Sequence, residues 1–176
     1  MNAETLWNMS NEERAEVIRT GVALDPRALV GWNYRGVSLG LPRLVERLTW
    51  TTFRKSFHAD PEDGERVSGI NVRVEQDGVR APIRPTRRAG KDFTFGPFAI
   101  ESLPEGGTPF RCGHGLVFDY GKKHGRLHPM GITRDVVVAL DDRGDLLLGA
   151  LYIELGTTRV KTPSFFTLER DTRVAS

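Results

Sequence analysis

The C-terminal third of the chain has the sequence pattern of an antiparallel β-meander. Runs of apolar and β-branched residues alternate there with short turn segments, such as residues 141–145 and the pair Gly156-Thr157. The predicted strands are Gly115–Tyr120, Arg134–Leu140, Leu146–Leu155, Thr158–Lys161 and Phe165–Leu168. A meander has to bury one face and protect its edges, so it normally closes into a barrel or forms a sandwich. This pattern constrains the fold more than any other part of the sequence.

The segments before residue 115 add further strands. Ser68–Gln76 alternates apolar and polar residues, and Asp77-Gly78 followed by residues 79–83 predicts a hairpin. The other predicted strands are Leu29–Val37, a β-rich segment at Trp50–Phe53, and the aromatic segments Phe93–Phe95 and Phe98–Ile100. Prolines interrupt residues 80–91, which are predicted to form an exposed loop. We expect roughly nine to eleven strands at the short spacing of an all-β barrel.

Two helices are predicted in addition to the strands. Ser10-Asn11-Glu12-Glu13 has the form of a capping box, which predicts a helix from Asn11 to Thr20 with Gly21 as a left-handed cap. Its apolar stripe is thin, so residues 1–28 are expected to pack as a helical segment outside the barrel. A second short helix is predicted after the first strand, where apolar residues recur at helical spacing at Leu41, Leu44, Val45 and Leu48.

The composition is that of one ordinary domain over residues 1–176. The net charge is only +2, which is too balanced for a dedicated nucleic-acid-binding protein. The single cysteine, Cys112, excludes an intrachain disulfide and a multi-cysteine metal site. The sequence shows neither a signal peptide nor an apolar run near the ~20 residues that a membrane span needs. We therefore expect a cytoplasmic protein, and the sequence leaves open whether it is a monomer or a homodimer.

Gly31-Trp32 lies on the predicted first strand, after an N-terminal helix. This arrangement resembles the Gly-x-Trp motif of lipocalin-like (calycin) barrels, although Gly and Trp are adjacent here. In those barrels the Trp closes the bottom of the cup and an Arg from the last strands packs over it; the resemblance implies this role for Arg170. The stretch from Gly31 to Phe57 also resembles a bacterial group of small barrels with a Gly-x-Trp-x-Gly motif. The resemblance implies a cup for a lipophilic small molecule and implies no catalytic residue.

The predicted fold is all-β: an antiparallel calycin-like barrel, of the lipocalin or fatty-acid-binding kind, with an N-terminal helix and one short helix after the first strand. The predicted function is binding of a small hydrophobic or amphipathic ligand inside the barrel. The aromatic residues expected to line the cup are Phe53, Phe95, Phe98, Phe118, Tyr120 and Phe166. One cation near the mouth would hold the polar end of the ligand.

Strand alternation points either Arg134 or Asp135 into the barrel. An inward Arg134 beside Tyr120 would bind a ligand carboxylate through two hydrogen bonds. The alternative, which we favour, is an ion pair of Arg134 with Asp119 or Asp135 at the barrel rim. The same two interpretations apply to three further cations, Arg35, Lys55 and Arg73.

Two other functions fit the same barrel. The cup would serve as the reaction chamber of a cyclase or isomerase, with Tyr34, Tyr120 or a buried Asp as the acid–base group. A buried carboxylate or tyrosine with a strongly shifted pKa in a closed cavity would favour this enzyme. Alternatively, the barrel is filled by its own side chains and serves as a structural or interaction module. The sequence contains no motif that decides whether the protein is an enzyme.

Loop residues give weaker indications. His124 and His128 are four residues apart, but the Gly and Pro around them oppose a helix. Scattered loop histidines such as these and His114 are usually solvated, so we expect no metal ion and no cofactor. Cys112 and His114 are not expected to form a thiolate–imidazole pair, because no third group orients them, and Cys112 is expected to be a plain surface cysteine.

Two basic loops, 80–91 and 121–133, would form a positive mouth if they lay at the same end of the barrel. Solvated loop charge is the favoured alternative. Few aromatic residues adjoin these loops, so nucleic-acid binding is not expected. The sequence leaves open whether the two loops form a lid.

Overall fold

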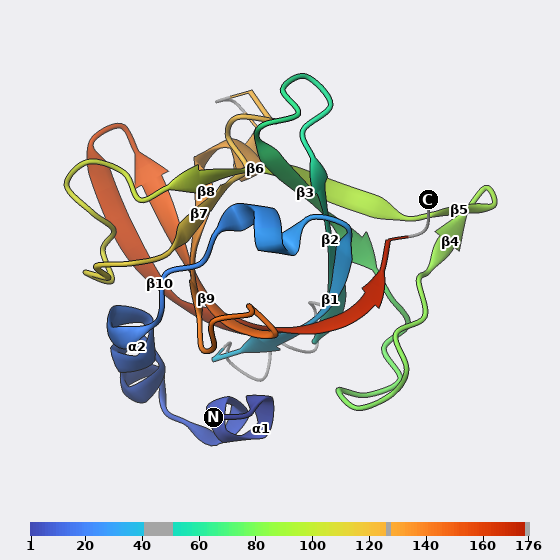
Figure 1. The fold of residues 1–176 in the computed structure, drawn as a ribbon, viewed down its shortest axis with the longest axis horizontal. Coiled ribbons are helices and arrows are strands. Elements are labelled where there is room, and N and C mark those ends of the chain that lie inside the picture. Colours follow the sequence, from blue (N-terminus) through green and yellow to red (C-terminus); the bar gives the residue numbers. More distant parts are fainter. Residues whose placement is uncertain (41–50, 126–127, 175–176) are drawn as a thin grey trace.

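The computed structural model describes residues 1–40, 51–125 and 128–174 of the chain. Within these residues, eight antiparallel strands form a closed barrel in the order β1-β10-β9-β8-β7-β6-β3-β2 (Figure 1). They are β1 (Trp32–Leu39), β2 (Thr52–Ala59), β3 (Val67–Arg73), β6 (Thr94–Ser102), β7 (Leu116–Asp119), β8 (Thr133–Ala139), β9 (Leu146–Leu155) and β10 (Thr158–Arg173). A separate hairpin consists of β4 (Arg87–Arg88) and β5 (Lys91–Asp92). The predicted all-β antiparallel barrel is confirmed.

The C-terminal meander forms half of this barrel, because β7, β8, β9 and β10 are neighbours both in the sequence and in the sheet. Residues 158–161 and 165–168, predicted as two strands, belong to the single strand β10, and the two aromatic segments likewise merge in β6. The register shifts near a proline in each case, Pro163 in β10 and Pro97 in β6. A bulge accommodates the missing N–H of the proline, so the strand continues past it.

The hairpin predicted at Asp77-Gly78 is wrong. The strand β3 ends before this pair, and residues 79–83 are not a strand. Gly78 does turn the chain, with φ at +112°. The prolines that follow remove backbone donors that a paired strand would need. The segment instead makes an isolated bridge from Val74 to Pro85 before it reaches β4.

Two helices, α1 (Ala3–Asn8) and α2 (Asn11–Thr20), pack on the outside of the barrel (Figure 1). The capping box of α2 is confirmed: the Ser10 hydroxyl accepts from the backbone N–H of Glu13, and the Glu13 carboxylate accepts from that of Ser10. Helix α1, which was not predicted, is capped by the side chain of Asn2. Leu6 and Ile18 anchor the two helices in an outer hydrophobic cluster.

Gly21 ends α2 for a different reason from the predicted one. Its φ is −61°, so the predicted left-handed cap is wrong. A Cβ atom at this position would lie only 2.4 Å from the Cβ atom of Val138. Glycine therefore allows the chain to approach the barrel wall closely, and the next residue, Val22, pairs with Ala139 of β8.

The short helix η1 (Pro26–Leu29) lies across one opening of the barrel (Figure 1). Leu29 is fully buried against side chains of the barrel interior. Arg170 fixes this closed end, because its Nε donates to the Tyr34 hydroxyl at 3.2 Å and its Cζ lies 4.9 Å from the ring centroid of Trp32. The packing of Arg170 over Trp32 that the resemblance implied is confirmed, and Arg173 lies over the same ring at 3.7 Å.

The barrel wall is apolar on both faces along β8 and β9. The inner cluster includes Val137, Ala139 and Leu147. The outer cluster, beneath the helices, includes Val136, Val138, Leu148 and also Cys112. Cys112 is buried, so its predicted surface position is wrong: the loop before β7 folds over the outer face and packs the thiol there.

The short helix predicted around residues 41–48 lies outside the described residues. Among the helices that the structure describes, none has the length and apolar character that crossing a bilayer requires.

Candidate functional site

A cavity of about 200 Å³ opens at the end of the barrel opposite η1. Its apolar lining consists of Phe53, Phe95, Met130, Leu151 and Phe166. Its polar lining consists of Lys55, Asn71, Tyr120 and Asp135, with Ser38 and Ser164. Between this cavity and η1 the interior is filled by the inner hydrophobic cluster. The barrel is thus solid at its closed end and hollow at its open end.

Strand alternation brings two opposite charges into the cavity. On β2, Lys55 points inward with Phe53 and Phe57, because successive side chains of a strand alternate between its faces. On β8, Asp135 points inward in the same way as Val137. Strands β2 and β8 stand on opposite sides of the ring of strands. Closure of the barrel is therefore what makes the two charges meet.

Three oxygen atoms hold the Lys55 ammonium in the cavity. Its Nζ donates to Asn71 Oδ1 at 2.8 Å and to the Tyr120 hydroxyl at 2.6 Å, and it lies 3.5 Å from Asp135 Oδ2. The side chains of Lys55 and Asp135 are each only 3% exposed. An ammonium group has three donors and no acceptor, so three oxygens satisfy it completely.

Further hydrogen bonds orient the partners of Lys55. The Asn71 side-chain N–H donates to the Gly96 carbonyl at 2.9 Å, which turns the Asn71 Oδ1 toward the lysine. The Tyr120 hydroxyl donates to Asp135 Oδ2 at 2.9 Å, so its oxygen accepts from Lys55. The four side chains form one connected polar network, called the Lys55 network below. Such networks hold their members in one arrangement when every group is satisfied.

Aromatic rings surround the ammonium. The ring centroids of Phe53, Phe98, Phe118, Tyr120 and Phe166 lie between 4.7 and 5.6 Å from Nζ. Aromatic faces attract a cation, by about 0.5–2 kcal/mol for a favourable pair. The rings therefore offset part of the cost of removing the ammonium from water.

Burial shifts the pKa values of this network. Desolvation lowers the pKa of Lys55 to about 8, although the Asp135 carboxylate opposes the change. Desolvation also raises the pKa of Asp135, with Lys55 opposing, and raises the pKa of Tyr120 well above its usual value. Tyr120 therefore remains protonated at neutral pH. The pKa values of Lys55 and Asp135 lie closer together than in water, which eases proton exchange between them.

The structure divides the predicted aromatic lining into two groups. Phe53, Phe95, Tyr120 and Phe166 line the cavity. Phe98 and Phe118 are fully buried in the inner cluster, where their rings stack with centroids 4.8 Å apart. Tyr34, the other predicted tyrosine, lies at the closed end, where its hydroxyl donates to the Gly144 carbonyl at 2.7 Å.

None of the three predicted arginines is among the described residues that line the cavity. Arg134 lies on the outer face of β8, 3.1 Å from Asp119, which is one of the ion pairs considered from the sequence. Arg35 points outward from β1 and donates to two carbonyls of the loop after β3, at 3.0 and 2.8 Å. Arg73 lies at the exposed end of β3, with its guanidinium 6.0 Å from an aromatic ring.

The central residues of the site were only partly predicted. Lys55 was recognised as a cation and Asp135 as one of two alternatives, but Asn71 and Met130 were not predicted at all. The position of Lys55 between two phenylalanines of β2 is the signal that would have placed it, because all three share a face. Met130 reaches the cavity from the loop helix η2 (Pro129–Ile132), and no periodic pattern marks such a residue.

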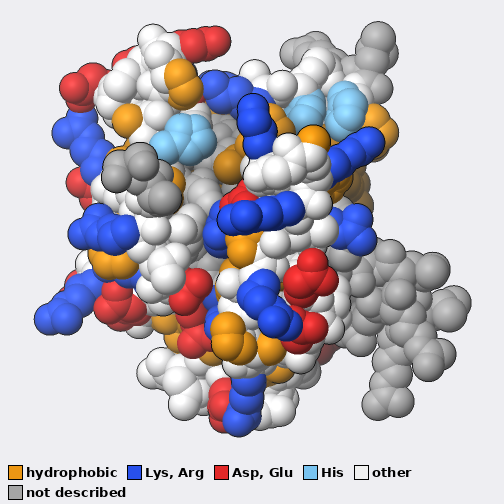
Figure 2. All heavy atoms as spheres, turned by 90° about the vertical axis from the view of Figure 1, so that its right-hand side faces the viewer, with side chains coloured by type: hydrophobic (Ala, Val, Ile, Leu, Met, Phe, Trp, Pro, Cys, Tyr) orange, Lys and Arg blue, Asp and Glu red, His pale blue; other side chains and the backbone are white. Residues whose placement is uncertain are grey.

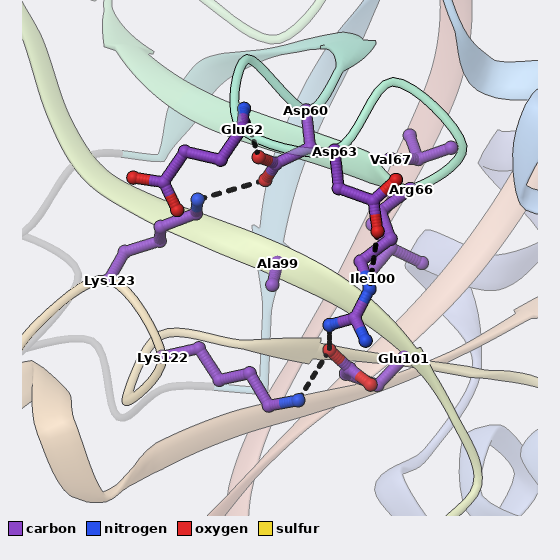
Figure 3. Close-up of a pocket in the computed structure, with 10 residues that line it drawn as sticks. All are labelled: Asp60, Glu62, Asp63, Arg66, Val67, Ala99, Ile100, Glu101, Lys122 and Lys123. Carbon is purple, nitrogen blue, oxygen red and sulfur yellow. Dashed lines mark hydrogen bonds and ion pairs between the residues drawn. The ribbon is translucent and has the colours of Figure 1, made fainter.

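A second hollow, of about 180 Å³, lies at the surface between the β2–β3 turn, β6 and the residues that follow β7 (Figure 3). Most of its charged side chains pair with one another: Lys123 lies 2.8 Å from Asp60, and Lys122 lies 2.7 Å from Glu101. Hydrogen bonding to Lys123 contributes to a pKa of Asp60 far below its usual value. Arg66 adds a longer contact of 3.9 Å to Glu101. These ion pairs link the β2–β3 turn, β6 and the residues after β7, so we interpret the charges as stabilising the local structure.

The two loop histidines stack on each other. The ring centroids of His124 and His128 are 4.5 Å apart, and His128 Nδ1 accepts from the backbone N–H of Met130. In the described part of the chain, no three His, Cys, Asp or Glu side chains are placed to hold a metal ion.

The basic loop 80–91 forms ion pairs with acidic neighbours. Arg80 pairs with Glu4 of α1, and Arg84 pairs with Asp77, each at 2.5 Å. Figure 2 views the molecule from the side of β4 and β5 and shows acidic and basic side chains intermixed on this face. The arrangement agrees with mutually balanced, solvated loop charge.

No protein-family model matches this chain, and a search of curated proteins finds no similar sequence.

Proposed function

We propose that the protein binds a small amphipathic molecule in the open end of its barrel. The apolar part of the ligand would lie against Phe53, Phe95 and Phe166, and its polar end would reach the Lys55 network. The observation that supports this proposal is a cavity with aromatic walls and a buried lysine among them. An apolar cavity with a few convergent polar groups is the usual form of a small-molecule site.

The size of the cavity limits the ligand. Its volume of about 200 Å³ is below the roughly 300–1,000 Å³ of pockets that enclose drug-sized molecules. The proposed ligand is therefore a single ring or a short chain, or a longer molecule whose tail leaves through the mouth.

The charge balance of the cavity favours an uncharged polar end. Lys55 is already paired with Asp135, so a ligand carboxylate would meet a like charge close to the cation. The arginine that was a candidate for binding a carboxylate, Arg134, lies outside the barrel. A hydroxyl or carbonyl oxygen accepts a hydrogen bond without adding charge, so alcohols, aldehydes and ketones fit better than fatty acids.

Titration with matched ligands tests this proposal. Primary alcohols and carboxylic acids of equal chain length are titrated by calorimetry, and we expect saturable binding near one per chain with the alcohols favoured. Ser164→Phe places a ring in the cavity mouth and should abolish binding, whereas Ser164→Ala should preserve it. Non-saturating uptake, or equal binding by the Phe variant and the wild type, would contradict the proposal.

A second candidate function is acid–base catalysis in the same cavity. The hydrogen bond from Tyr120 to Asp135, together with the raised pKa of both groups, favours it. Its test is hydrogen–deuterium exchange at the α-carbon of a bound ketone, followed by NMR. Exchange that exceeds the buffer rate and disappears in Tyr120→Phe supports catalysis, and exchange at the buffer rate with the ketone bound excludes it.

A further inference from the structure

Lys55 combines two properties that are rarely found together in a lysine. Its side chain is almost completely buried, yet it lines a cavity that opens to solvent. A buried ion pair often stabilises a fold no more than well-packed apolar residues of the same volume would. The position of this pair at a cavity, and not in the filled part of the barrel, points to a chemical role for the amine.

The hydrogen bonds of Lys55 leave room for a neutral amine. The two short contacts, to Asn71 Oδ1 at 2.8 Å and to the Tyr120 hydroxyl at 2.6 Å, need only two N–H groups. The third N–H of the ammonium faces Asp135 Oδ2 at the longer distance of 3.5 Å. If this proton leaves, both short hydrogen bonds persist and the nitrogen gains a lone pair. An amine with a lone pair is a nucleophile.

Asp135 and Tyr120 are close enough to Lys55 to accept its proton and to return it. Asp135 is the nearest carboxylate to the ammonium and can accept its proton, and the lowered pKa of Lys55 makes this transfer less costly than in water. Tyr120 bridges the two, since it accepts from Lys55 and donates to Asp135 at 2.9 Å. A proton can therefore move between these three groups without any other donor.

We propose that Lys55 captures a small lipophilic aldehyde or ketone as a covalent imine. This inference rests on the proposed function, because the carbonyl compound must first enter the cavity. The aromatic walls would hold its hydrocarbon part, and its carbonyl carbon would lie against Nζ.

The reaction balances without an oxidant or a reductant. The lone pair of Nζ forms a C–N bond to the carbonyl carbon, and the carbonyl oxygen takes up a proton from the Tyr120–Asp135 pair. The amine nitrogen then returns a proton to this pair, and the new hydroxyl takes up that proton as the C–O bond breaks, so that it leaves as water. The product is a C=N bond between Lys55 and the ligand. A protonated imine keeps one positive charge on nitrogen, which remains within reach of Asp135 and the surrounding rings.

Reductive trapping tests this inference on the wild-type protein. Cinnamaldehyde is the probe, because its ring fits an aromatic cavity, and cyanoborohydride converts an imine to a stable secondary amine. Peptide mass mapping then compares Lys55 with Lys91, an exposed lysine on β5 that serves as the internal reference. We expect Lys55 to react at least about tenfold faster at pH 7.5, because a lowered pKa leaves more free amine.

Cinnamyl alcohol has no carbonyl group, so it can bind in the cavity but cannot form an imine. It therefore distinguishes non-covalent binding from covalent capture. It should bind saturably and slow the labelling of Lys55 but not that of Lys91. Lys55→Met should remove the fast labelling, and Tyr120→Phe should reduce its rate with the alcohol still bound. Without reductant, the protonated imine should also shift the absorbance of the aldehyde to longer wavelength.

Each remaining outcome overturns the inference. If the alcohol binds saturably but Lys55 is labelled no faster than Lys91, covalent capture is refuted and the proposed binding function stands. If Lys55 is labelled but the alcohol gives no protection, the reaction does not use the cavity and the inference fails. If the alcohol does not bind at all, the proposed function and the inference fail together.

Discussion

Replacing Asp135 by Asn should destabilise the protein by an amount that depends on pH. Two unit charges 3.5 Å apart attract by about 5 kcal/mol at an effective dielectric constant of about 20. The variant is destabilised by less than this attraction energy, because its Lys55 can lose a proton and become neutral. With the pKa of Lys55 at about 8, a neutral lysine costs about 1 kcal/mol at pH 7, about 3 kcal/mol at pH 6 and almost nothing at pH 9.

The sign follows from proton binding. Without Asp135 the pKa of Lys55 falls further below 8, so between pH 6 and 8 the folded variant binds fewer protons than the folded wild type. The stability of the variant then rises more steeply with pH, and the difference from the wild type shrinks toward alkaline pH. Urea unfolding followed by circular dichroism at pH 6, 7, 8 and 9 measures this difference.

The matched control is Asp119→Asn, which removes the carboxylate beside Arg134 on the outer face. Arginine does not deprotonate in this range, so the cost of this variant should stay constant with pH. A constant cost for Asp135→Asn, or a cost that grows toward pH 9, would refute the assignment of Lys55 as a buried cation held by Asp135.

Three further predictions follow from named contacts. Relative to Lys55→Met, the wild type should gain about 3 kcal/mol of stability between pH 8 and 10.5, because a pKa lowered to about 8 makes the folded state bind fewer protons there; parallel pH profiles would contradict this. Tyr34→Phe should cost about 1–3 kcal/mol in urea unfolding, since a buried carbonyl loses its donor; a loss within error of zero would show that water replaces the hydroxyl. Gly21→Ala should cost about 1–3 kcal/mol, because the new methyl group would overlap Val138, whereas Gly113→Ala, which meets open space, should lower the melting temperature little.

Several elements of the fold show how much local sequence can specify. The turn chemistry around Gly156, the uninterrupted run that became β9 and the capping box at Ser10 all act over a few neighbouring residues, and each gave the observed element. Predictions that depended on pairing with another strand were less accurate. In the predicted hairpin at residues 68–83, Gly78 turns the chain as expected. The second strand does not form, because the prolines that follow lack the N–H groups that strand pairing needs.

The site illustrates the same division. Alternation along β8 establishes that Arg134 and Asp135 face opposite ways, but it does not tell which face is the interior, because Val136 and Val137 are both buried. The outer face is buried because α1, α2 and the loop before β7 cover it, and the two helices are more than a hundred residues away from β8 in the sequence. The sequence by itself thus determined most of the strands, several of their turns and the grouping of side chains by face. Only closure of the sheet decided that Lys55 meets Asp135, and that a hollow remains at one end, because both depend on which strands stand opposite each other across the barrel.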